Sequence, residues 1–279
     1  MDLLRQTLDL CKIYNIKPEK SKGQNFLVDE DVYESMILSS DLKKDDVVLE
    51  VGPGLGILTF KISEKVKKVL AVELDNKLAE LLNTLIISKN KKNIKIFNND
   101  VLKIKGENIE KLGKYKIVAN LPYNITSIFL RKFLSIHNKP EKIVLLLQKE
   151  VVDRIVSEPP DMSLLAVSVQ FYAEVKKIIE VKKESFYPIP KIDSAIIEIT
   201  PRKNNFFSDY QEEKKFFRLL KIGFSAKRKM LKNNLSLGLK INQKEIENII
   251  FSLGLDSKCR AEELSLNDWI KIFNVVKLK

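Results

Sequence analysis

The stretch Val47-Val48-Leu49-Glu50-Val51-Gly52-Pro53-Gly54-Leu55-Gly56 organises the rest of the chain. Its first five residues are typical of a buried parallel strand, its glycines of a tight turn, and residues 57–66 of a helix. A turn with little side-chain bulk at a helix N-terminus lets backbone N–H groups approach a ligand closely. We therefore expect a nucleotide-type pocket at the end of this strand.

The spacing of the turn is G-x-G-x-G, one residue short of the dinucleotide pattern G-x-G-x-x-G, so it predicts no pyrophosphate cradle. A pocket for a nucleoside without phosphates fits better. A second apolar stretch, residues 69–72, ends on Glu73, where a carboxylate can accept two hydrogen bonds from a ribose diol. The alternative is that the glycines only connect strand to helix and that Glu73 is a surface charge.

Length and composition limit the possible classes of protein. With 279 residues, 44% of them hydrophobic, the chain suits one large or two modest globular domains. Its two cysteines, Cys11 and Cys259, lie far apart without metal-ligand spacing, so we expect no disulfide framework and no metal site, as in a reducing cytoplasm. The apolar runs are too short to span a bilayer, and Asp2 and Asp9 interrupt any export signal.

The net charge of +12 is unevenly distributed. Residues 201–279 carry 17 Lys/Arg and 9 Asp/Glu, a net charge of +8, which leaves +4 for the first 200 residues. Clustered positive charge indicates a polyanionic partner such as nucleic acid. The alternative is a lysine-rich composition that places lysine on every surface.

Strands and helices alternate between residues 47 and 148. We expect strands at 47–51, 69–73, 94–98, 116–120 and 142–148, with helices near 57–66, 76–88 and 126–136. This rhythm predicts an α/β fold, a Rossmann-like parallel sheet with right-handed crossovers and helices on both faces. Ligands of such sheets bind at the carboxyl ends of the strands, where Glu73, Asn99 with Asp100, and Asn120 stand.

The flanking segments are less regular. Residues 2–13 fit a short amphipathic helix of open role, and Gly23–Leu27 an ordinary loop before a helix capped at about Asp29. After the alternating region we expect helices at 149–156 and up to about 172, strands near 174–181 and 193–200, and between them an aromatic loop, 186–190, held extended by prolines.

Residues 201–209 are typical of a linker. Beyond it the pattern is wholly helical, at about 210–223, 226–234, 243–253 and 265–275. The sequence therefore predicts a cofactor-binding catalytic domain over residues 1–205 and a small helical domain over residues 206–279.

The turn Asn120-Leu121-Pro122-Tyr123 closes the fourth strand. It offers a side-chain carbonyl, backbone carbonyls freed from the sheet and a flat aromatic face, which suit a planar exocyclic amine. Such an amine needs positioning and electrostatic help more than a tuned base, and the only histidine, His137, stands in a predicted loop. The alternative is a plain strand-to-helix turn with Pro122 at the helix start and Tyr123 in the core.

Five motifs together resemble the ribosomal RNA adenine N6-dimethyltransferase family. They are Phe26-Leu27 after Gln24-Asn25, the glycine turn, the strand-end acids Glu73 and Asp100, Asn120 to Tyr123, and Phe186-Tyr187-Pro188-Ile189-Pro190. The likeness runs from about residue 20 to 200. Each motif alone is weak, and the specificity comes from their shared order and spacing.

The resemblance implies roles for single residues. S-adenosylmethionine would be the methyl donor, without a metal, and its contacts would be Asn25, Leu27, Gly52, Gly54, Glu73, Asp100 and Asn120. The target adenine would enter at Asn120, Leu121, Pro122 and Tyr123, and Tyr123 and Phe186 would stack on the flipped base.

Within that family the chain looks like the housekeeping branch, because it has Leu-Pro-Tyr where the antibiotic-resistance branch more often has Ile-Pro-Tyr, and a long basic helical tail. That branch dimethylates two adjacent adenosines in the 3′-terminal hairpin of 16S, small-subunit ribosomal RNA. The resemblance implies a cytoplasmic, monomeric enzyme that acts on a pre-30S particle in ribosome biogenesis. The chain departs from the bacterial housekeeping pattern at Lys22 and in its N-terminal helix.

Two other functions stay open. One is an RNA-binding assembly factor whose methyltransferase fold has lost its chemistry, against which intact Glu73, Asn120 and Tyr123 argue. The other is a DNA adenine methyltransferase, which usually has an acidic Asp-Pro-Pro-Tyr motif where Asn120 stands. For RNA contact we expect a basic ridge over residues 214–232, with phosphates as its targets.

Overall fold

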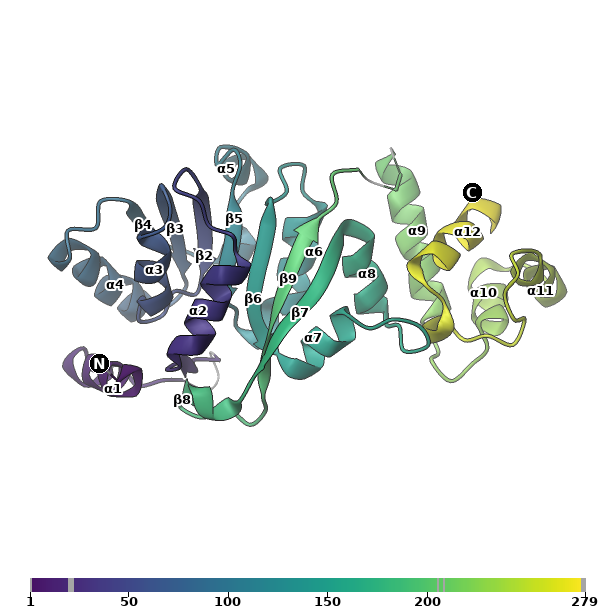
Figure 1. The fold of residues 1–279 in the computed structure, drawn as a ribbon. Coiled ribbons are helices and arrows are strands. Elements are labelled where there is room, and N and C mark those ends of the chain that lie inside the picture. Colours follow the sequence, from purple (N-terminus) through teal and green to yellow (C-terminus); the bar gives the residue numbers. More distant parts are fainter. Residues whose placement is uncertain (1, 20–22, 205, 208, 277–279) are drawn as a thin grey trace. The chain divides into compact units, whose positions relative to one another are not determined.

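The computed structural model describes residues 2–19, 23–204, 206–207 and 209–276, apart from the side chain of Tyr123 (Figure 1). Lys22, where the sequence departs from the bacterial housekeeping pattern, lies outside these residues. The chain divides into two compact units, residues 1–152 with 174–201, and residues 153–173 with 202–279. This division differs from the predicted boundary near residue 205 because residues 153–173 group with the second unit.

The first unit is built on a seven-stranded sheet of order β4-β3-β2-β5-β6-β9-β7. Its strands are β2 (Val47–Val51), β3 (Lys68–Glu73), β4 (Ile94–Asn98), β5 (Lys116–Asn120), β6 (Lys142–Gln148), β7 (Ala173–Val181) and β9 (Ser194–Pro201). The strands from β4 to β6 run parallel, as expected. The antiparallel pairing of β9 with β6 was not predicted. The link between β7 and β9 contains a 3-10 turn and the short strand β8 but no crossover helix, which is the usual connection between parallel strands.

Helices cover both faces of this sheet, with α2 in front of the strands and α6 behind them in Figure 1. The helices of the first unit are α1 (Leu3–Ile13), α2 (Glu30–Ser39), α3 (Ile57–Ser63), α4 (Asn76–Ser88), α5 (Gly106–Glu110), α6 (Thr126–Ser135) and the start of α7 (Lys149–Ile155). Short 3-10 turns occur at Val101–Lys103, Tyr123–Ile125 and Lys183–Ser185. The predicted cap is confirmed, since the Asp29 carboxylate accepts from the backbone of Asp31 and Val32.

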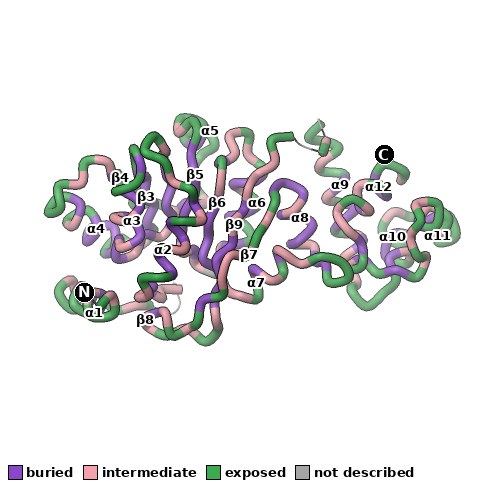
Figure 2. The backbone as a smooth tube through the Cα atoms, viewed as in Figure 1, coloured by how far each residue is buried: buried purple, intermediate pink, exposed green. Residues whose placement is uncertain are grey.

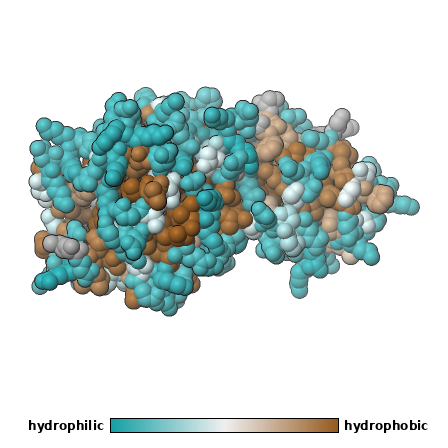
Figure 3. Space-filling model, viewed as in Figure 1, coloured by the Kyte–Doolittle hydropathy of each residue, from teal (hydrophilic) through white to brown (hydrophobic). Residues whose placement is uncertain are grey.

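The core lies along the central strands, which Figure 2 shows as buried. Every residue from Ile143 to Leu147 is fully buried, as expected for a strand covered on both faces. Seen from the same side, the surface is mainly hydrophilic, with hydrophobic side chains visible around the strands of the first unit (Figure 3).

A two-stranded antiparallel sheet joins two distant segments that the sequence predicted as loops. It pairs β1 (Phe26–Leu27) with β8 (Phe186–Tyr187), so that Leu27 lies opposite Phe186. The Val28 N–H extends the contact by donating to the Ser185 carbonyl (2.8 Å). The aromatic loop therefore fixes the backbone of the Gln-Asn-Phe-Leu motif.

The second unit is helical, with the end of α7, α8 (Leu164–Tyr172), α9 (Tyr210–Gly223), α10 (Leu231–Leu239), α11 (Gln243–Ser252), a 3-10 turn (Ala261–Glu263) and α12 (Leu266–Val276). It contains an aromatic cluster that runs from its core to its surface, made of Phe171, Tyr172, Phe206, Phe207, Phe216, Phe217 and Phe273. The predicted linker thus contributes the partly buried Phe207 and the exposed Phe206 to this cluster. The helix predicted at 226–234 was misplaced, because residues 224–230 form a turn before α10 begins.

Candidate active site

The glycine turn after β2 requires its glycines. Gly52, Gly54 and Gly56 have φ values of +66°, +56° and +82°, a region that side chains disfavour. A Cβ on Gly56 would come within 2.4 Å of a Leu82 methyl carbon, and one on Gly54 within 3.3 Å of the Phe26 ring. The turn therefore brings its backbone close to neighbouring groups, as a ligand cradle requires.

Glu73 stands at the end of β3 with its carboxylate fixed by backbone donors. The Gly54 N–H donates to one oxygen (3.1 Å) and the Asp75 N–H to the other (2.9 Å). The residue is 6% exposed. Burial raises its pKa, the negative charge of Asp75 adds to the rise, and the two N–H donors oppose it. Since each oxygen has a second lone pair, Glu73 can still accept bonds from a diol.

The end of β4 is tied to the same place. The Asn98 side chain donates to the Glu73 carbonyl (2.9 Å), and the Asn99 N–H donates to that carbonyl as well (2.9 Å). Asp100 caps the following 3-10 turn by accepting from the Leu102 N–H (2.8 Å). The strand-end acids Glu73 and Asp100 therefore belong to one connected edge, as the sequence predicted.

Asn120 closes the edge on its other side. Its Nδ2 donates to the Asn25 carbonyl (3.4 Å), and its Oδ1 accepts from none of the described donors. On the opposite side of the motif, the buried Tyr33 hydroxyl donates to the Leu27 carbonyl (2.9 Å). The Gln-Asn-Phe-Leu segment is thus held between α2 and the end of β5.

These segments enclose a cavity of about 980 Å³, which is large enough for a nucleoside cofactor. Nearly all predicted site residues line it: Asn25, Leu27, Gly52, Gly54, Glu73, Asp100, Asn120, Leu121 and Pro122. The Phe186 side chain does not, because it is 2% exposed and packs in the main core. The side chain of Tyr123 is outside the described part of the structure. The roles of these residues stay predictions.

One lining residue, Glu50, was missed by the sequence analysis. It is 1% exposed, and its Oε2 and the Thr59 hydroxyl have no hydrogen-bond partner among the described residues. Burial raises the pKa of Glu50 to about 8, and the charge of Glu73 adds to the rise, while the nearby Thr59 hydroxyl opposes it. A buried carboxyl group without an ion-pair partner among the described residues suits a ligand that brings a cation. The sequence contained a signal for this residue, since Glu50 is the one charged residue in an otherwise apolar strand.

The described residues contain no cluster of side chains suited to a metal ion. Within the same residues, no helix combines the length and apolarity needed to cross a membrane. His137 is exposed and does not line the cavity.

Comparison with known sequences gives consistent matches over nearly the whole chain. A family model described as "Ribosomal RNA adenine dimethylase" matches residues 15–278. A protein from Dehalococcoides mccartyi, named ribosomal RNA small subunit methyltransferase A, is 39% identical over 97% of this chain and 92% of its own length. One of the same name from Clostridium acetobutylicum is 35% identical over 95% of this chain and 96% of its own length.

Solved structures agree with these matches. A dimethyladenosine transferase from Plasmodium falciparum superimposes with a TM-score of 0.78 and 26% identity, covering 91% of this chain and 98% of that one. The 23S rRNA methyltransferase ErmE gives a TM-score of 0.75 over 91% of this chain and 100% of its own, at 22% identity, a likeness in fold alone.

Proposed function

The chain belongs to the ribosomal RNA adenine dimethylase family, and on that premise we propose that it dimethylates N6 of two adjacent adenosines in the 3′-terminal hairpin of 16S ribosomal RNA. Its reaction is ribosomal RNA adenine dimethylation. The observation that carries the proposal is that Glu73, Asn120 and the glycine turn line the same cavity. The substrate form we propose is a pre-30S particle, which implies a cytoplasmic enzyme, acting as a monomer.

S-adenosylmethionine fits the groups that line this cavity. Glu73 would accept the ribose hydroxyls, Asp100 would contact the adenine, and the glycine turn would lie against the cofactor without phosphates. The Glu50 carboxyl group, whose Oε2 has no hydrogen-bond partner among the described residues, would face the ammonium of the amino-acid part. When bound, this cofactor supplies an electrophilic methyl group on a sulfonium.

Asn120 acts on the substrate amine. The lone pair on N6 of adenine is delocalised into the ring, so the nitrogen must become pyramidal before it can attack. The Oδ1 atom of Asn120, which accepts from none of the described donors, would accept an N6–H bond and favour that geometry. After transfer the extra N6 proton passes to water, so no general base is required.

Tyr123 follows in the chain and would stack on the flipped adenine. The prediction for Phe186 is harder to meet, because its ring packs in the core. A contact between Phe186 and the base would require that ring to leave its present position. What supports a role for Phe186 is its backbone, which pairs with Leu27.

For RNA contact we propose the turn before α10 in the second unit. Lys227, Arg228 and Lys229 are consecutive and exposed there. The buried Asn234 side chain fixes the turn by donating to the carbonyls of Gly223 (2.7 Å) and Ala226 (3.1 Å). Three cations on a fixed turn suit phosphate groups, which position an RNA without reading its bases.

The broader basic ridge predicted over 214–232 is less uniform. Lys232 pairs with Glu247 (2.9 Å), and its side chain is only 14% exposed. The ammonium of Lys214 lies over the Tyr210 ring, 4.6 Å from its centre. These two lysines have structural partners within the unit, which leaves the 227–229 turn as the better candidate for RNA.

The direct test is methylation of isolated small subunits from cells that lack the modification. We expect mass spectrometry to find N6,N6-dimethyladenosine at two neighbouring positions near the 3′ end of 16S ribosomal RNA. Tight binding to subunits without methylation would favour the inactive assembly factor. Methylation of DNA adenines under the same conditions would favour the DNA methyltransferase.

The RNA-binding turn has its own test. Lys227→Ala, Arg228→Ala and Lys229→Ala together should weaken binding to small subunits and lower the log–log salt slope by roughly 0.7 to 0.9 for each phosphate that the variant can no longer neutralise. Lys67→Ala, Lys68→Ala and Lys92→Ala together, on exposed positions of the first unit, are the matched control. An unchanged slope in the 227–229 variant would place RNA selection elsewhere.

A further inference from the structure

We propose that the N-terminal arm, α1 with residues 14–19, is a strap over the cofactor cavity, and that Gln24 is the positioning residue that latches it to the Glu73 edge. The inference rests on the proposed function, because it concerns the exchange of the methyl donor. It assigns a role to α1, for which the sequence offered none.

The arm forms part of the cavity wall. Asn15, Ile16, Lys17 and Glu19 line the cavity together with the glycine turn and the start of α4. Asn15 has a φ of +48°, so the chain turns sharply after α1. The Ile16 N–H donates to the Cys11 carbonyl (2.8 Å), which directs the next residues toward the cavity.

Packing attaches the second half of the arm through a hydrophobic cluster separate from the main core, while Leu3 at the start of α1 packs against the main core. Cys11 and Ile16 pack there with Phe26, Leu55, Leu78 and Leu81. Phe26 is the residue whose ring lies against Gly54, and Leu55 belongs to the glycine turn itself. A small cluster of this kind can separate from the cavity without opening the main core.

Hydrogen bonds then connect the arm to the cofactor edge in one chain through the two ends of the Gln24 amide. The Glu19 N–H donates to Gln24 Oε1 (2.8 Å), and Gln24 Nε2 donates to Asp75 Oδ2 (3.3 Å). The Asp75 N–H in turn donates to Glu73 (2.9 Å). Asp75 also caps α4 through its other oxygen, with the Lys77 N–H 3.0 Å away.

Repeated methylation gives this arrangement a use. Each adenosine that receives two methyl groups requires two cofactor molecules in turn, so a spent cofactor must leave before the second transfer. The part of the arm that lines the cavity, residues 15–19, is attached by a small cluster and one side-chain latch, so it can open for that exchange while the edge of the sheet stays intact. Closing the strap would also hold Glu73 in its bonding position.

The latch can be tested by exchanging its two chemical partners. Gln24→Glu keeps an acceptor for the Glu19 N–H but sets a carboxylate against Asp75. Asp75→Asn keeps the Oδ1 cap on α4 but sets an amide donor against Gln24 Nε2. In the double variant, the new amide can donate to the new carboxylate, so the latch is restored with its polarity reversed.

We expect each single variant to raise the dissociation constant for S-adenosylmethionine about tenfold, as for loss of a hydrogen bond to a charged group. The double variant should return to within about threefold of the unaltered protein. In turnover assays the singles should raise the KM for the cofactor while kcat at saturating cofactor and the affinity for small subunits stay the same. A change in folding alone would not produce that split or that rescue.

Gln243→Glu and Asp209→Asn are the matched controls, since they make the same chemical changes at an exposed helix residue and at the N-cap of α9 in the second unit. Singles that bind the cofactor like the unaltered protein, or a double variant no better than the singles, would overturn the latch. Failure of the unaltered protein to bind S-adenosylmethionine would instead overturn the proposed function.

Discussion

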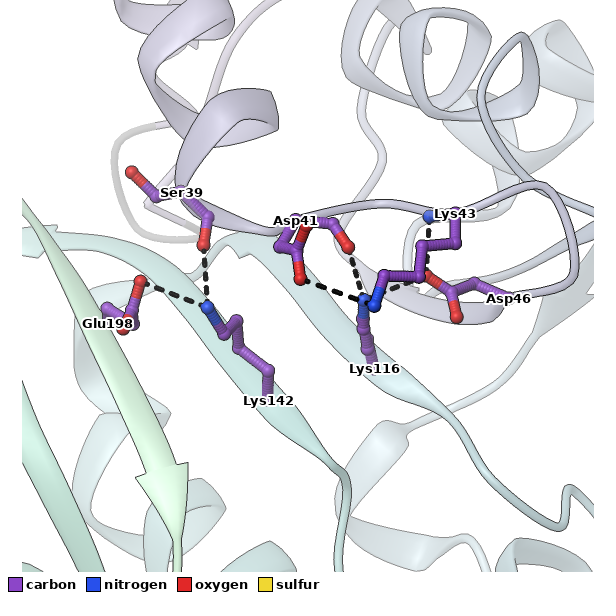
Figure 4. Close-up of polar contacts among 7 residues, drawn as sticks. All are labelled: Ser39, Asp41, Lys43, Asp46, Lys116, Lys142 and Glu198. Carbon is purple, nitrogen blue, oxygen red and sulfur yellow. Dashed lines mark hydrogen bonds and ion pairs between the residues drawn. The ribbon is translucent and has the colours of Figure 1, made fainter.

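The two edges of the parallel sheet differ in whether their buried ionisable groups have ion-pair partners. At the amino edge, Lys116 at the start of β5 pairs with Asp46 (2.8 Å) and donates to the Asp41 carbonyl. Lys142 at the start of β6 pairs with Glu198 (3.3 Å) and donates to the Ser39 carbonyl (Figure 4). At the carboxyl edge, Glu50 and Glu73 form no ion pair with any described residue.

The difference separates structural charges from the charges that we propose to bind the ligand. Both edges contain buried ionisable groups at strand ends, but only the amino edge supplies opposite charges from its own chain. Both lysines also lie near the end of α2, where Lys142 satisfies the Ser39 carbonyl that the helix leaves free and Lys116 satisfies the Asp41 carbonyl in the turn that follows. At the other edge, ionised carboxyl groups have no opposite charge, so their burial is unfavourable in free energy. A cationic ligand would reduce that unfavourable term.

The largest expected effect is a loss of stability when the buried ion pair at the amino edge is removed. Lys116→Met should destabilise the protein by about 3–5 kcal/mol, because the side chains of Lys116 and Asp46 are 8% and 15% exposed and Asp46 would remain buried without its cation. Urea unfolding measures the loss. Cofactor affinity of the folded protein should stay unchanged, since the site is at the opposite edge.

Lys142→Met is the matched control at the same edge. Its pair with Glu198 is 22% and 24% exposed, so water partly replaces the lost partner and the loss should be about 1 kcal/mol or less. Equal losses for the two lysines would mean that burial does not set their importance.

The second prediction concerns pH and the carboxyl edge. Since the pKa of Glu50 is about 8 in the fold and about 4.3 in an unfolded chain, the folded state keeps a proton that the unfolded state releases. Stability is therefore full below about pH 4 and falls as pH rises toward 8, by on the order of 3 kcal/mol between pH 5 and 8. Glu50→Gln should remove this fall, which urea unfolding across that range would detect.

A parallel pH dependence in the Glu50→Gln variant and the unaltered protein would contradict the assignment. Saturating S-adenosylmethionine should also reduce the fall, because its ammonium would stabilise the ionised carboxylate. This second measurement distinguishes a carboxylate that stays without an opposite charge from one whose opposite charge is supplied by the ligand.

The third prediction tests chemistry at the carboxyl edge. Asn120→Ala should lower kcat by about a hundredfold, the scale of removing one preorganised polar group, with RNA affinity nearly unchanged. Single-turnover methylation of small subunits is the measurement. Asn83→Ala, at an exposed position of α4, is the control, and near-normal rates in Asn120→Ala would refute the role.

The smallest effect expected at the carboxyl edge concerns Glu73. Glu73→Ala removes the acceptor of the Gly54 and Asp75 N–H groups, so the dissociation constant for S-adenosylmethionine should rise by about an order of magnitude or more. Calorimetry on the folded variant measures it. Unchanged affinity would mean that this edge does not bind the cofactor.

Several features were predictable because local sequence encodes them. Strands β2, β3, β5 and β6 are nearly continuous apolar runs, which follow from burial on both faces, whereas β4 at the sheet edge is mostly exposed. Gly52, Gly54 and Gly56 stand where positive φ values are needed. Glu73, Asp100 and Asn120 could be placed at one edge because the carboxyl ends of parallel strands coincide there. Pattern and topology together thus predicted most of the cavity wall.

Other features depended on partners far away in the sequence. Two-residue strands such as β1 and β8 have no periodicity, so only their mutual pairing shows that Phe186 supports Leu27. Lys116 looks like any surface lysine until Asp46 and the end of α2 surround it. The Gln24 latch belongs to the same class, because Gln24 and Asp75 stand 51 residues apart. Sequence by itself determined which residues face the core and which turns can form, because backbone preference and burial are local. Only the tertiary structure decided which charges are compensated, because that depends on groups that long-range packing brings together.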